Sequence, residues 1–324
     1  MATENAPQTL REAILFFADY ENCKRAVMAI RWPDGIVRCP KCGSIEVTYL
    51  ANQRRWKCYE KHPRQQFSLK VGTIFEDSPL GLEKWLPALW LLTNCKNGIS
   101  SYELGRALGV TQKTAWFMLS RLRLALQDRQ TGGKLGGEVE ADETYIGGVA
   151  RNMHASKRDR VSVKRGRCLA GKVAVMALLQ RHTQDGPSRV RTAVLNSLKR
   201  GHIQAHVREH VRPGSVLHTD AFSSYTGLDA EYTHNVIDHA ECYVKGNVHT
   251  NGCENFWSLL KRAIKGTYVS IEPFHLFRYL DEEGFRFNHR AGTDASRFVA
   301  ALKGVLERRL TYAALTGSEL PERC

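Results

Sequence analysis

The sequence predicts an α/β protein in which a small cysteine-bearing module and a helical region precede a mixed β-sheet flanked by helices. Three observations support this prediction. Cysteines cluster between residues 39 and 58, apolar residues follow helical spacing from 76 to 128, and from Glu138 onward strand patterns come first and helical patterns follow. A length of 324 residues indicates two or three domains of about 100 to 150 residues each.

The first 75 residues form the first predicted domain. Apolar residues at helical spacing from Leu10 to Ile30 predict two short helices, and Trp32-Pro33-Asp34-Gly35 is typical of a turn. A cysteine-bearing module follows this turn and ends near Phe75. The chain has nine cysteines, an odd number without regular spacing, which argues against a disulfide framework. Three of them cluster, which suits metal binding in a reducing compartment.

The clustered cysteines predict a structural zinc site. Cys39 and Cys42 lie three positions apart before a glycine that lets the backbone turn around the metal, which is the pattern of a zinc knuckle. Cys58 and His62 add a third thiolate and an imidazole at C-x₃-H spacing, so that the four residues form a tetrahedral Cys₃His set for Zn²⁺. The alternatives are a small buried hydrophobe for Cys58 and a surface position for His62.

Residues 76–130 form the second predicted domain, a helix-turn-helix region. Apolar spacing predicts helices over 82–94 and 100–126, the second of them broken at Gly109. Ser100 with Glu103 has the pattern of a capping box, Gly109 fits a tight turn, and Thr111 caps the helix that follows.

The second helix of this region is the predicted DNA-reading element. Its polar residues expected to face DNA are Gln112, Lys113 and Arg121. The residues expected to pack inward are Ala115, Met118, Leu119 and Leu122. An ordinary αα-hairpin shares most of these signals and is the alternative, but a basic chain with a neighbouring zinc module favours DNA binding.

A glycine-rich segment, residues 130–137, predicts a flexible linker and a domain boundary. The third predicted domain, residues 131–290, has strand patterns and then helical ones, and residues 291–324 are a predicted C-terminal tail. The expected strands cover residues 138–146, 172–180, 190–195, 216–219 and 232–236. The expected helices cover residues 195–204, 254–264 and 273–288.

A long basic loop is expected between the first two strands of this domain, from Val149 to Lys172, with one acid, Asp159. It is either a solvated insertion or an arm that contacts DNA phosphates beside the active site. The predicted contacts are Lys157, Arg158, Arg160, Lys164 and Arg165.

Three carboxylates, each in a different local setting, form the candidate active site. Asp142 and Asp220 each end a strand pattern, and Glu254 opens a helical pattern. Such a set can hold two Mg²⁺ or Mn²⁺ ions, which can stabilise the attacking and leaving oxygens of a phosphoryl displacement. Lys261 lies two turns after Glu254 on the same helical face, where its ammonium can contact a DNA phosphate.

Each carboxylate also has an ordinary structural explanation. Asp142 could be a surface acid at a strand end, and Glu138 and Glu140 share its strand face, so that the register matters. Asp220 could cap a helix. Glu254 with Asn251 satisfies the capping-box pattern, with Asn251 as the N-cap residue.

The charge and hydropathy of the chain narrow the functional classes. Lys and Arg number 47 against 33 Asp and Glu, a formal net charge of +14, which is expected of a nucleic-acid-binding protein, although many basic proteins bind nothing specific. The N-terminus has no secretory pattern, and the longest apolar stretch, Trp85 to Leu92, is far shorter than the ~20 residues that span a bilayer. We therefore expect an intracellular protein without a membrane partner.

Several motifs, in order, resemble the DDE transposases of bacterial insertion sequences, specifically the ISXO-type group with an N-terminal zinc ribbon. The resemblance covers residues 10–290. The motifs that carry it are Trp32-Pro33-Asp34-Gly35, Cys39-Pro40-Lys41-Cys42, Gln66-Phe67-Ser68, Gly72-Thr73-Ile74-Phe75-Glu76, Asp142-Glu143-Thr144-Tyr145-Ile146-Gly147-Gly148, His218-Thr219-Asp220, His249-Thr250-Asn251-Gly252-Cys253-Glu254-Asn255-Phe256-Trp257-Ser258-Leu259-Leu260-Lys261-Arg262, Tyr279-Leu280-Asp281-Glu282 and Phe285-Arg286-Phe287-Asn288.

The resemblance implies a ribonuclease-H-like catalytic domain whose first two acids lie on adjacent strands and whose third lies on a helix. It also implies cleavage of double-stranded DNA at terminal inverted repeats, joining of the 3′ ends to target DNA, and a homo-oligomer on DNA in the bacterial cytoplasm with the nucleoid. The chain departs from the group at the second zinc half, where C-x₂-C would place a ligand at Lys61. The third catalytic position varies in the group, so Asn251 and Asn255 remain alternatives to Glu254.

Two other functions fit the same motifs. A decayed transposase could act as a DNA-binding regulator through the zinc ribbon and helix-turn-helix alone. A nuclease could hydrolyse DNA without joining it.

Overall fold

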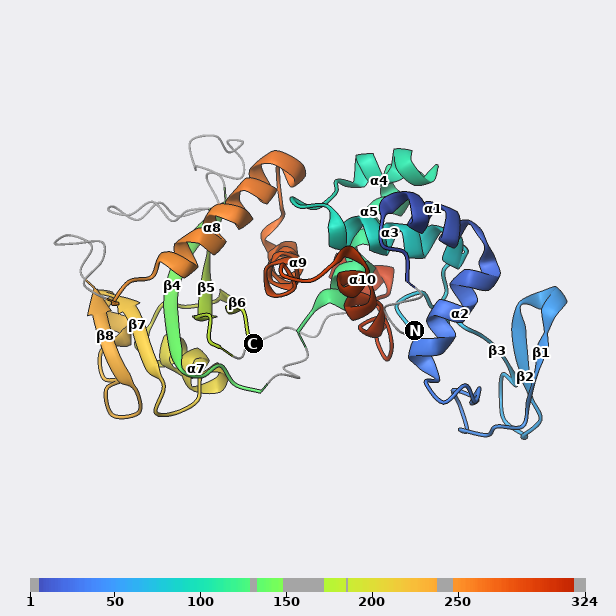
Figure 1. Ribbon diagram of the computed structural model, residues 1–324, viewed down its shortest axis with the longest axis horizontal. Coiled ribbons are helices and arrows are strands. Elements are labelled where there is room, and N and C mark those ends of the chain that lie inside the picture. Colours follow the sequence, from blue (N-terminus) through green and yellow to red (C-terminus); the bar gives the residue numbers. More distant parts are fainter. Residues whose placement is uncertain (1–5, 129–132, 148–171, 185, 238–246, 318–324) are drawn as a thin grey trace. The chain divides into compact units, whose positions relative to one another are not determined.

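The computed structural model describes residues 6–128, 133–147, 172–184, 186–237 and 247–317 (Figure 1). The chain divides into two compact units. The first consists of Met1–Gln127 together with Gly292–Cys324, and the second of Asp128–Ala291. In the parts of the chain described, no helix has both the length and the apolar character that a bilayer crossing requires.

Helix α3 (Leu82–Asn94) is the centre of the first unit. Helices α1 (Leu10–Ala18), α2 (Tyr20–Arg31), α5 (Gln112–Leu126) and α10 (Asp294–Lys303) pack against it. The rings of Phe17 and Trp90 lie 5.1 and 5.5 Å from that of Phe298, so aromatic packing ties α10 to α1 and α3. The residues predicted as a C-terminal tail thus include α10, whose apolar face is buried in this core, and the short helix α11 (Tyr312–Thr316).

A three-stranded antiparallel sheet forms the cysteine module of the first unit. Its strands are β1 (Val47–Leu50), β2 (Arg55–Cys58) and β3 (Gln66–Ser68), in that order. The buried ring of Trp56 on β2 stacks on Phe67 of β3 at 5.9 Å. This aromatic contact gives the small sheet a core of its own.

Helices α4 (Ser101–Leu108) and α5 begin and end at the residues that the sequence predicts. Ser100 and Glu103 form the complete capping box, and the Thr111 hydroxyl accepts the N–H of Thr114. Gly109 ends α4 with φ +62°, a left-handed conformation that glycine adopts without strain.

The second unit contains a five-stranded mixed sheet with the order β6-β5-β4-β7-β8. Strand β4 pairs antiparallel with β5, which pairs antiparallel with β6, whereas β4, β7 and β8 run parallel. All five strands fall within one or two residues of the predicted ranges. Their bounds are β4 (Glu138–Gly147), β5 (Lys172–Gln180), β6 (Arg189–Leu195), β7 (Val216–Asp220) and β8 (Thr233–Ile237).

Helices cover both faces of this sheet (Figure 1). On one face α7 (Arg200–His210) buries Ile203 and Val207 against apolar residues of β4, β5 and β7. On the other face α8 (Asn251–Ala263) and α9 (Leu276–Asn288) pack against β5 and β6. The short elements η4 (Ser223–Tyr225), η5 (Ile264–Tyr268, a π-helix) and η6 (Pro273–His275) connect these layers.

The predicted flexible linker is ordered in its second half, which corrects that prediction. The side chain of Leu135 is fully buried, and its N–H donates to the carbonyl oxygen of His210 at 2.7 Å. Burial of Leu135 in the core that α7 covers makes residues 133–137 part of the second unit.

Candidate active site and zinc centre

Asp142 and Asp220 lie on adjacent parallel strands and on the same face of the sheet. The register of β4 and β7 pairs Ala141 with Thr219, so the two aspartates follow at the same level. Neighbouring strands lie about 4.8 Å apart, and residues two apart share a face. The parallel pairing of β4 with β7 therefore brings the two predicted acids together. The expectation that Asp142 ends a strand is wrong, because β4 continues to Gly147; Asp220 does end β7.

Helix α8 covers this acidic face and contacts it through Trp257, whose Nε1–H donates to Asp142 Oδ2 at 2.9 Å. One face of the helix is apolar, with Cys253, Phe256 and Trp257 buried in the core. Glu254 lies in the first turn and is exposed. The amphipathic pattern of α8 thus orients Glu254 away from the core and beside the aspartates.

The charges of Asp220 and Glu254 act on Asp142. Its pKa is raised to about 6, mainly by burial and in part by these two negative charges, while the hydrogen bond from Trp257 lowers it. Crowding of like charges in a partly buried place favours protonation, and a bound cation relieves it. The donor set consists of carboxylate oxygens, which suit Mg²⁺ or Mn²⁺.

The three carboxylates do not form one tight group. Among the described residues, only two groups of possible ligands have all their ligand atoms within 4.8 Å, and neither contains Asp142. Asp142, Asp220 and Glu254 therefore do not form a compact three-ligand set by themselves.

Glu143, next to Asp142, points to the opposite sheet face and accepts a hydrogen bond from the Tyr225 hydroxyl. Burial raises the pKa of Glu143 to about 8, with further contributions from the charges of Asp220 and Asp142. The hydroxyl of Tyr225 partly offsets this effect. Near neutral pH Glu143 is therefore mostly protonated and adds little negative charge to the site.

The capping box of Asn251 and Glu254, considered as the structural alternative for Glu254, does not form. The N-cap residue of α8 is Thr250, and its side chain makes no capping bond. The N–H of Cys253 instead donates to Glu140 Oε2 at 3.0 Å, so a carboxylate from β4 takes the place of a local cap. Asn251 is exposed at the first helical position.

Asp220 also shapes the turn that follows β7, as its carboxylate Oδ1 accepts the N–H of Phe222 at 3.1 Å. The hydrogen bond leaves the other carboxylate oxygen available to a ligand. Lys261 is exposed on α8, two turns after Glu254, where the sequence places it.

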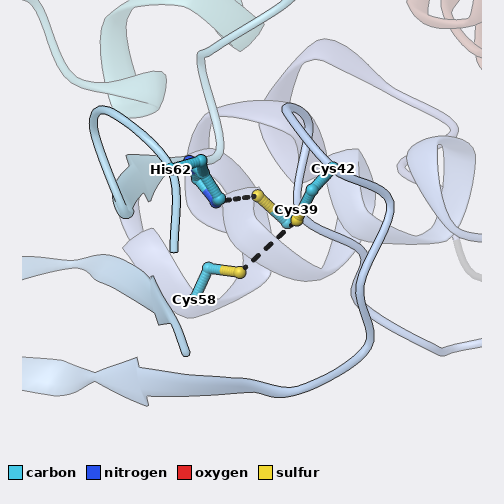
Figure 2. Close-up of side chains that lie close together, drawn as sticks. All are labelled: Cys39, Cys42, Cys58 and His62. Atoms are coloured by element: carbon cyan, nitrogen blue, oxygen red, sulfur yellow. Dashed lines mark hydrogen bonds between the residues drawn. The ribbon is translucent and has the colours of Figure 1, made fainter. Parts of the chain in front are cut away.

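The four predicted zinc ligands come together in the first unit (Figure 2). Their ligand atoms all lie within 4.8 Å of one another. Cys39 Sγ lies 3.4 Å from His62 Nε2, and Cys42 Sγ lies 3.6 Å from Cys58 Sγ. Zn–S bonds of about 2.3 Å and Zn–N bonds of about 2.0 Å in a tetrahedron place such atoms about 3.5–3.8 Å apart. The group has the dimensions of a zinc site.

Hydrogen bonds around the cluster favour metal binding. Burial alone would raise the pKa of Cys39, but the backbone N–H groups of Cys42 and Lys41 lower it to about 7, which makes the thiolate available. His62 Nδ1 lies 3.0 Å from the Pro63 carbonyl oxygen, an arrangement that leaves Nε2 for the metal.

The second group of possible ligands in the described part of the chain is His206, Glu209 and His210 on α7. The two imidazoles line a cavity of about 10 Å³ together with Arg191. The positive guanidinium opposes a cation there, so we assign no metal to this group.

The residues predicted to contact DNA have different surroundings. Gln112 and Lys113 are exposed at the start of α5. The prediction for Arg121 is wrong, because its side chain is buried and donates to the carbonyl oxygens of Ile74, Glu76 and Leu310 at 2.7–3.0 Å. The predicted contacts Lys157, Arg158, Arg160, Lys164 and Arg165 lie outside the described residues.

Three residues that contact the acids of β4 were not predicted from the sequence. Trp257 could have been found from its position three residues after Glu254, which turns it toward the sheet. Arg181 and His249, which contact Glu140 at 2.8 and 3.4 Å, carry no local signal, because their partner lies far away in the sequence.

The fold and the two sites define a zinc-ribbon protein with a carboxylate site on an α/β domain. Residues 134–288 match the ISXO2-like transposase domain, and residues 19–60 match the transposase zinc-ribbon domain. A protein in transposable element ISH50 of Halobacterium salinarum is 29% identical over 257 residues, which are 76% of this chain and 83% of the relative. A transposase-like protein of Haemophilus influenzae is 33% identical over 102 residues, which are 31% of this chain and 82% of that protein.

The chain therefore belongs to the ISXO2-like transposase family.

Proposed function

We propose that the protein is a DDE-type transposase that binds the ends of an insertion sequence, cleaves the DNA there and joins the 3′ ends to target DNA. The observation that carries this proposal is the arrangement of Asp142, Asp220 and Glu254. Two of the acids lie side by side on parallel strands, and the third lies on a helix that is hydrogen-bonded to the first. Family membership supports the same function.

The sheet supports a ribonuclease-H-like assignment for the second unit. Three antiparallel strands, β6-β5-β4, are extended by the parallel strands β7 and β8, and helices cover both faces. Parallel strands place their carboxyl ends at one edge, and such an edge commonly carries the ligands in α/β sheets. Asp220 is the last residue of β7, which is that position.

The residues present fit a pair of Mg²⁺ or Mn²⁺ ions. The carboxylate of Asp142 interacts electrostatically with those of Asp220 and Glu254. The indole of Trp257 donates a hydrogen bond to one of its oxygens and so orients it. When bound, two ions supply activation of the attacking oxygen and charge stabilisation of the leaving oxygen. Lys261, exposed two turns along α8, would hold a DNA phosphate beside them.

The first unit would recognise the DNA ends. We assign zinc to Cys39, Cys42, Cys58 and His62 as a structural ion, because a closed four-ligand site leaves no open position for chemistry. Helices α4 and α5 would act as a helix-turn-helix in which Gln112 and Lys113 face DNA.

Cleavage and joining on the gene's own flanking DNA test this function. A plasmid that carries this DNA is incubated with the full chain, Mn²⁺ or Mg²⁺ and a second, labelled duplex. We expect nicks at defined positions and covalent joining to the second duplex, both lost in Asp142→Ala and Asp220→Ala. The matched control is Glu231→Ala, which removes an exposed acid paired with Arg208.

The outcomes separate the other two functions. End binding without any cleavage by the unaltered chain would indicate a regulator, and cleavage without joined products would indicate a nuclease. Strand transfer by the Asp142→Ala/Asp220→Ala protein would contradict the site assignment.

Metal binding can be measured without any DNA. Of the six tryptophans, only Trp257 lies between residues 128 and 291. With 5-fluorotryptophan incorporated, the fluorine resonance that Trp257→Phe removes is expected to broaden on addition of Mn²⁺, and Asp220→Ala should weaken this effect. If the Trp257 resonance broadens at the same Mn²⁺ concentration in Asp220→Ala as in the unaltered protein, the proposed site is contradicted.

A further inference from the structure

Glu140 is a buried carboxylate on the same sheet face as Asp142, two residues before it. Its side chain is 1% exposed. Burying a carboxylate is costly unless it is paired and hydrogen-bonded. Its oxygens lie 2.8 Å from Arg181 Nε, 3.0 Å from the N of Cys253 and 3.4 Å from His249 Nδ1. Arg181 donates to Oε1 and the Cys253 N–H donates to Oε2, so both carboxylate oxygens of Glu140 are hydrogen-bonded, while His249 Nδ1 accepts from the Arg181 guanidinium at 3.0 Å.

Arg181 connects the strand to the segment that leads into α8. Besides Glu140, its guanidinium bonds to Glu138 Oε2 at 2.7 Å and to the carbonyl oxygens of Asn247 and His249 at 2.8 and 2.9 Å. The fixed fork of donors in a guanidinium suits such a set of acceptors. The chain therefore enters α8 along a path that Arg181 sets.

Gly252 allows α8 to approach Glu140. A Cβ atom at this position would lie 2.7 Å from Glu140 Oε2 and 2.9 Å from Leu179 Cδ2, closer than real Cβ atoms come. The close approach, and not an unusual backbone angle, explains the glycine. It also brings the carboxylate to the positive end of the helix dipole.

Two carboxylates of β4 thus accept hydrogen bonds from α8, and the Cys253 thiol adds a third bond to the Glu140 carbonyl oxygen at 3.7 Å. Glu140 accepts from Cys253, and Asp142 accepts from Trp257. Four residues of a helix rise about 6 Å and two residues of a strand about 6.6 Å, so the two spacings match. Glu254 lies between the attachment points.

We propose, resting on the two-metal function above, that Glu140 and Arg181 are positioning residues that fix the first turn of α8 on β4 and thereby place the carboxylate of Glu254 beside Asp142. Neither residue touches metal or DNA in this assignment. A shift of Glu254 by about 1 Å would loosen its metal contact, and misplacements of this size can cost about 10²-fold in rate.

Two variants test the proposal in different ways. Glu140→Gln keeps the shape but removes the charge, and Gly252→Ala keeps every polar group but pushes α8 away from Glu140. Both are expected to weaken Mn²⁺ binding, measured by electron paramagnetic resonance, about tenfold or more. Single-turnover cleavage should fall about 10²-fold. The zinc content and the affinity for the DNA ends of both variants should stay within about twofold of the unaltered chain. The matched control Glu231→Gln should stay within about twofold in Mn²⁺ affinity and cleavage rate as well.

The decisive measurement is a double-mutant cycle with Glu254→Ala, read out by Mn²⁺ affinity. If Glu140 acts through Glu254, then Glu140→Gln adds no further loss once Glu254 is removed. Additive losses would overturn the proposal. It would also be overturned if the Glu140→Gln and Gly252→Ala proteins were both unfolded at the assay temperature, because the cluster would then support the unit as a whole.

The result for Asp142→Ala separates this inference from the proposed function. If that variant still binds Mn²⁺ and cleaves DNA, the two-metal site itself is wrong. If it does neither, whereas Glu140→Gln matches the unaltered chain, only the positioning role fails.

Discussion

Substituting Asp142 by Asn is expected to stabilise the metal-free protein near neutral pH while it abolishes activity. A pKa of about 6 in place of the ordinary 3.8 corresponds to about 3 kcal/mol in favour of the protonated carboxyl. Because the Asp142 side chain is partly exposed and solvent screens its charge, we reduce this free energy to about 2 kcal/mol. Asn cannot ionise, and its side-chain oxygen can still accept the hydrogen bond from Trp257.

The sign of the pH dependence follows from the raised pKa. The folded protein holds the Asp142 proton more tightly than the unfolded chain does, so the free energy of unfolding falls as the pH rises from about 4 to about 6 and stays lower above that. The advantage of Asp142→Asn should therefore be about 2 kcal/mol at pH 7.5 and should vanish below about pH 4. For a unit of this size, that equals about 4–8 °C in the unfolding midpoint.

The assay is thermal unfolding without added Mg²⁺ or Mn²⁺, followed through the fluorine resonance of Trp257. Glu231→Gln serves as the control, because it removes an exposed carboxylate and should shift the midpoint by little. With saturating Mn²⁺ the order should reverse, because only the unaltered protein gains stability from the ion. A lower midpoint for Asp142→Asn at pH 7.5 in the absence of metal would refute the reasoning.

Three further predictions concern the zinc centre and the DNA contacts. Cys39→Ser should lose the zinc, measured by atomic absorption, and should unfold the ribbon and abolish end binding, with the Trp257 resonance unchanged. Lys113→Ala should weaken end binding and reduce its salt dependence without changing stability. Arg121→Ala should instead lower the free energy of unfolding by about 2–4 kcal/mol, since three carbonyl groups lose their donor. Equal stability of the two variants in urea unfolding would contradict the structural role of Arg121. Lys261→Ala should slow cleavage at least tenfold with end binding nearly unchanged. The control Lys199→Ala, which removes an exposed lysine before α7, should leave the cleavage rate unchanged. Similar cleavage rates for the two variants would contradict a phosphate contact of Lys261.

The sequence is informative where the signal is local. Alternation of Glu138, Glu140 and Asp142 with Val139 and Ala141 indicates β4, because one face of the strand packs in the apolar core under α7 and the other carries the acids. The ends of α4 and α5 are predicted because their caps lie within four residues. The zinc site is found from Cys39, Cys42 and Cys58 for the same reason. His62 at C-x₃-H spacing joins these cysteines in the structure.

Arg121 shows where local reasoning fails. A long basic side chain on a helix of a basic protein suggests a DNA contact, but its acceptors are main-chain carbonyl groups at residues 74, 76 and 310. Every residue has a main-chain carbonyl group, so the amino-acid types do not reveal which of these groups accept a hydrogen bond. Only the packing of the unit reveals that this arginine is structural.

The same limit explains the cap of α8. Asn251 has the right residue type and the right spacing to Glu254, yet the N–H of Glu254 donates to the Thr250 carbonyl oxygen, and the N–H of Cys253 donates to Glu140, more than a hundred residues earlier. Burying Glu140 in the unit makes its carboxylate a stronger acceptor than a local side chain in water would be. The competition between the two caps is decided by tertiary structure.

The acids on β4 therefore have different roles despite their equal spacing. Glu140 accepts hydrogen bonds from the Arg181 guanidinium and from the Cys253 N–H, so that its charge is compensated within the protein. Within the described part of the chain, the indole of Trp257 is the one side-chain donor to Asp142, and the like charges of Asp220 and Glu254 act on this carboxylate, which favours a proton or a metal cation there. The alternation of the strand alone cannot distinguish the two residues. The supply of donors does, and it supports the proposed roles of Glu140 in holding α8 and of Asp142 as a metal ligand.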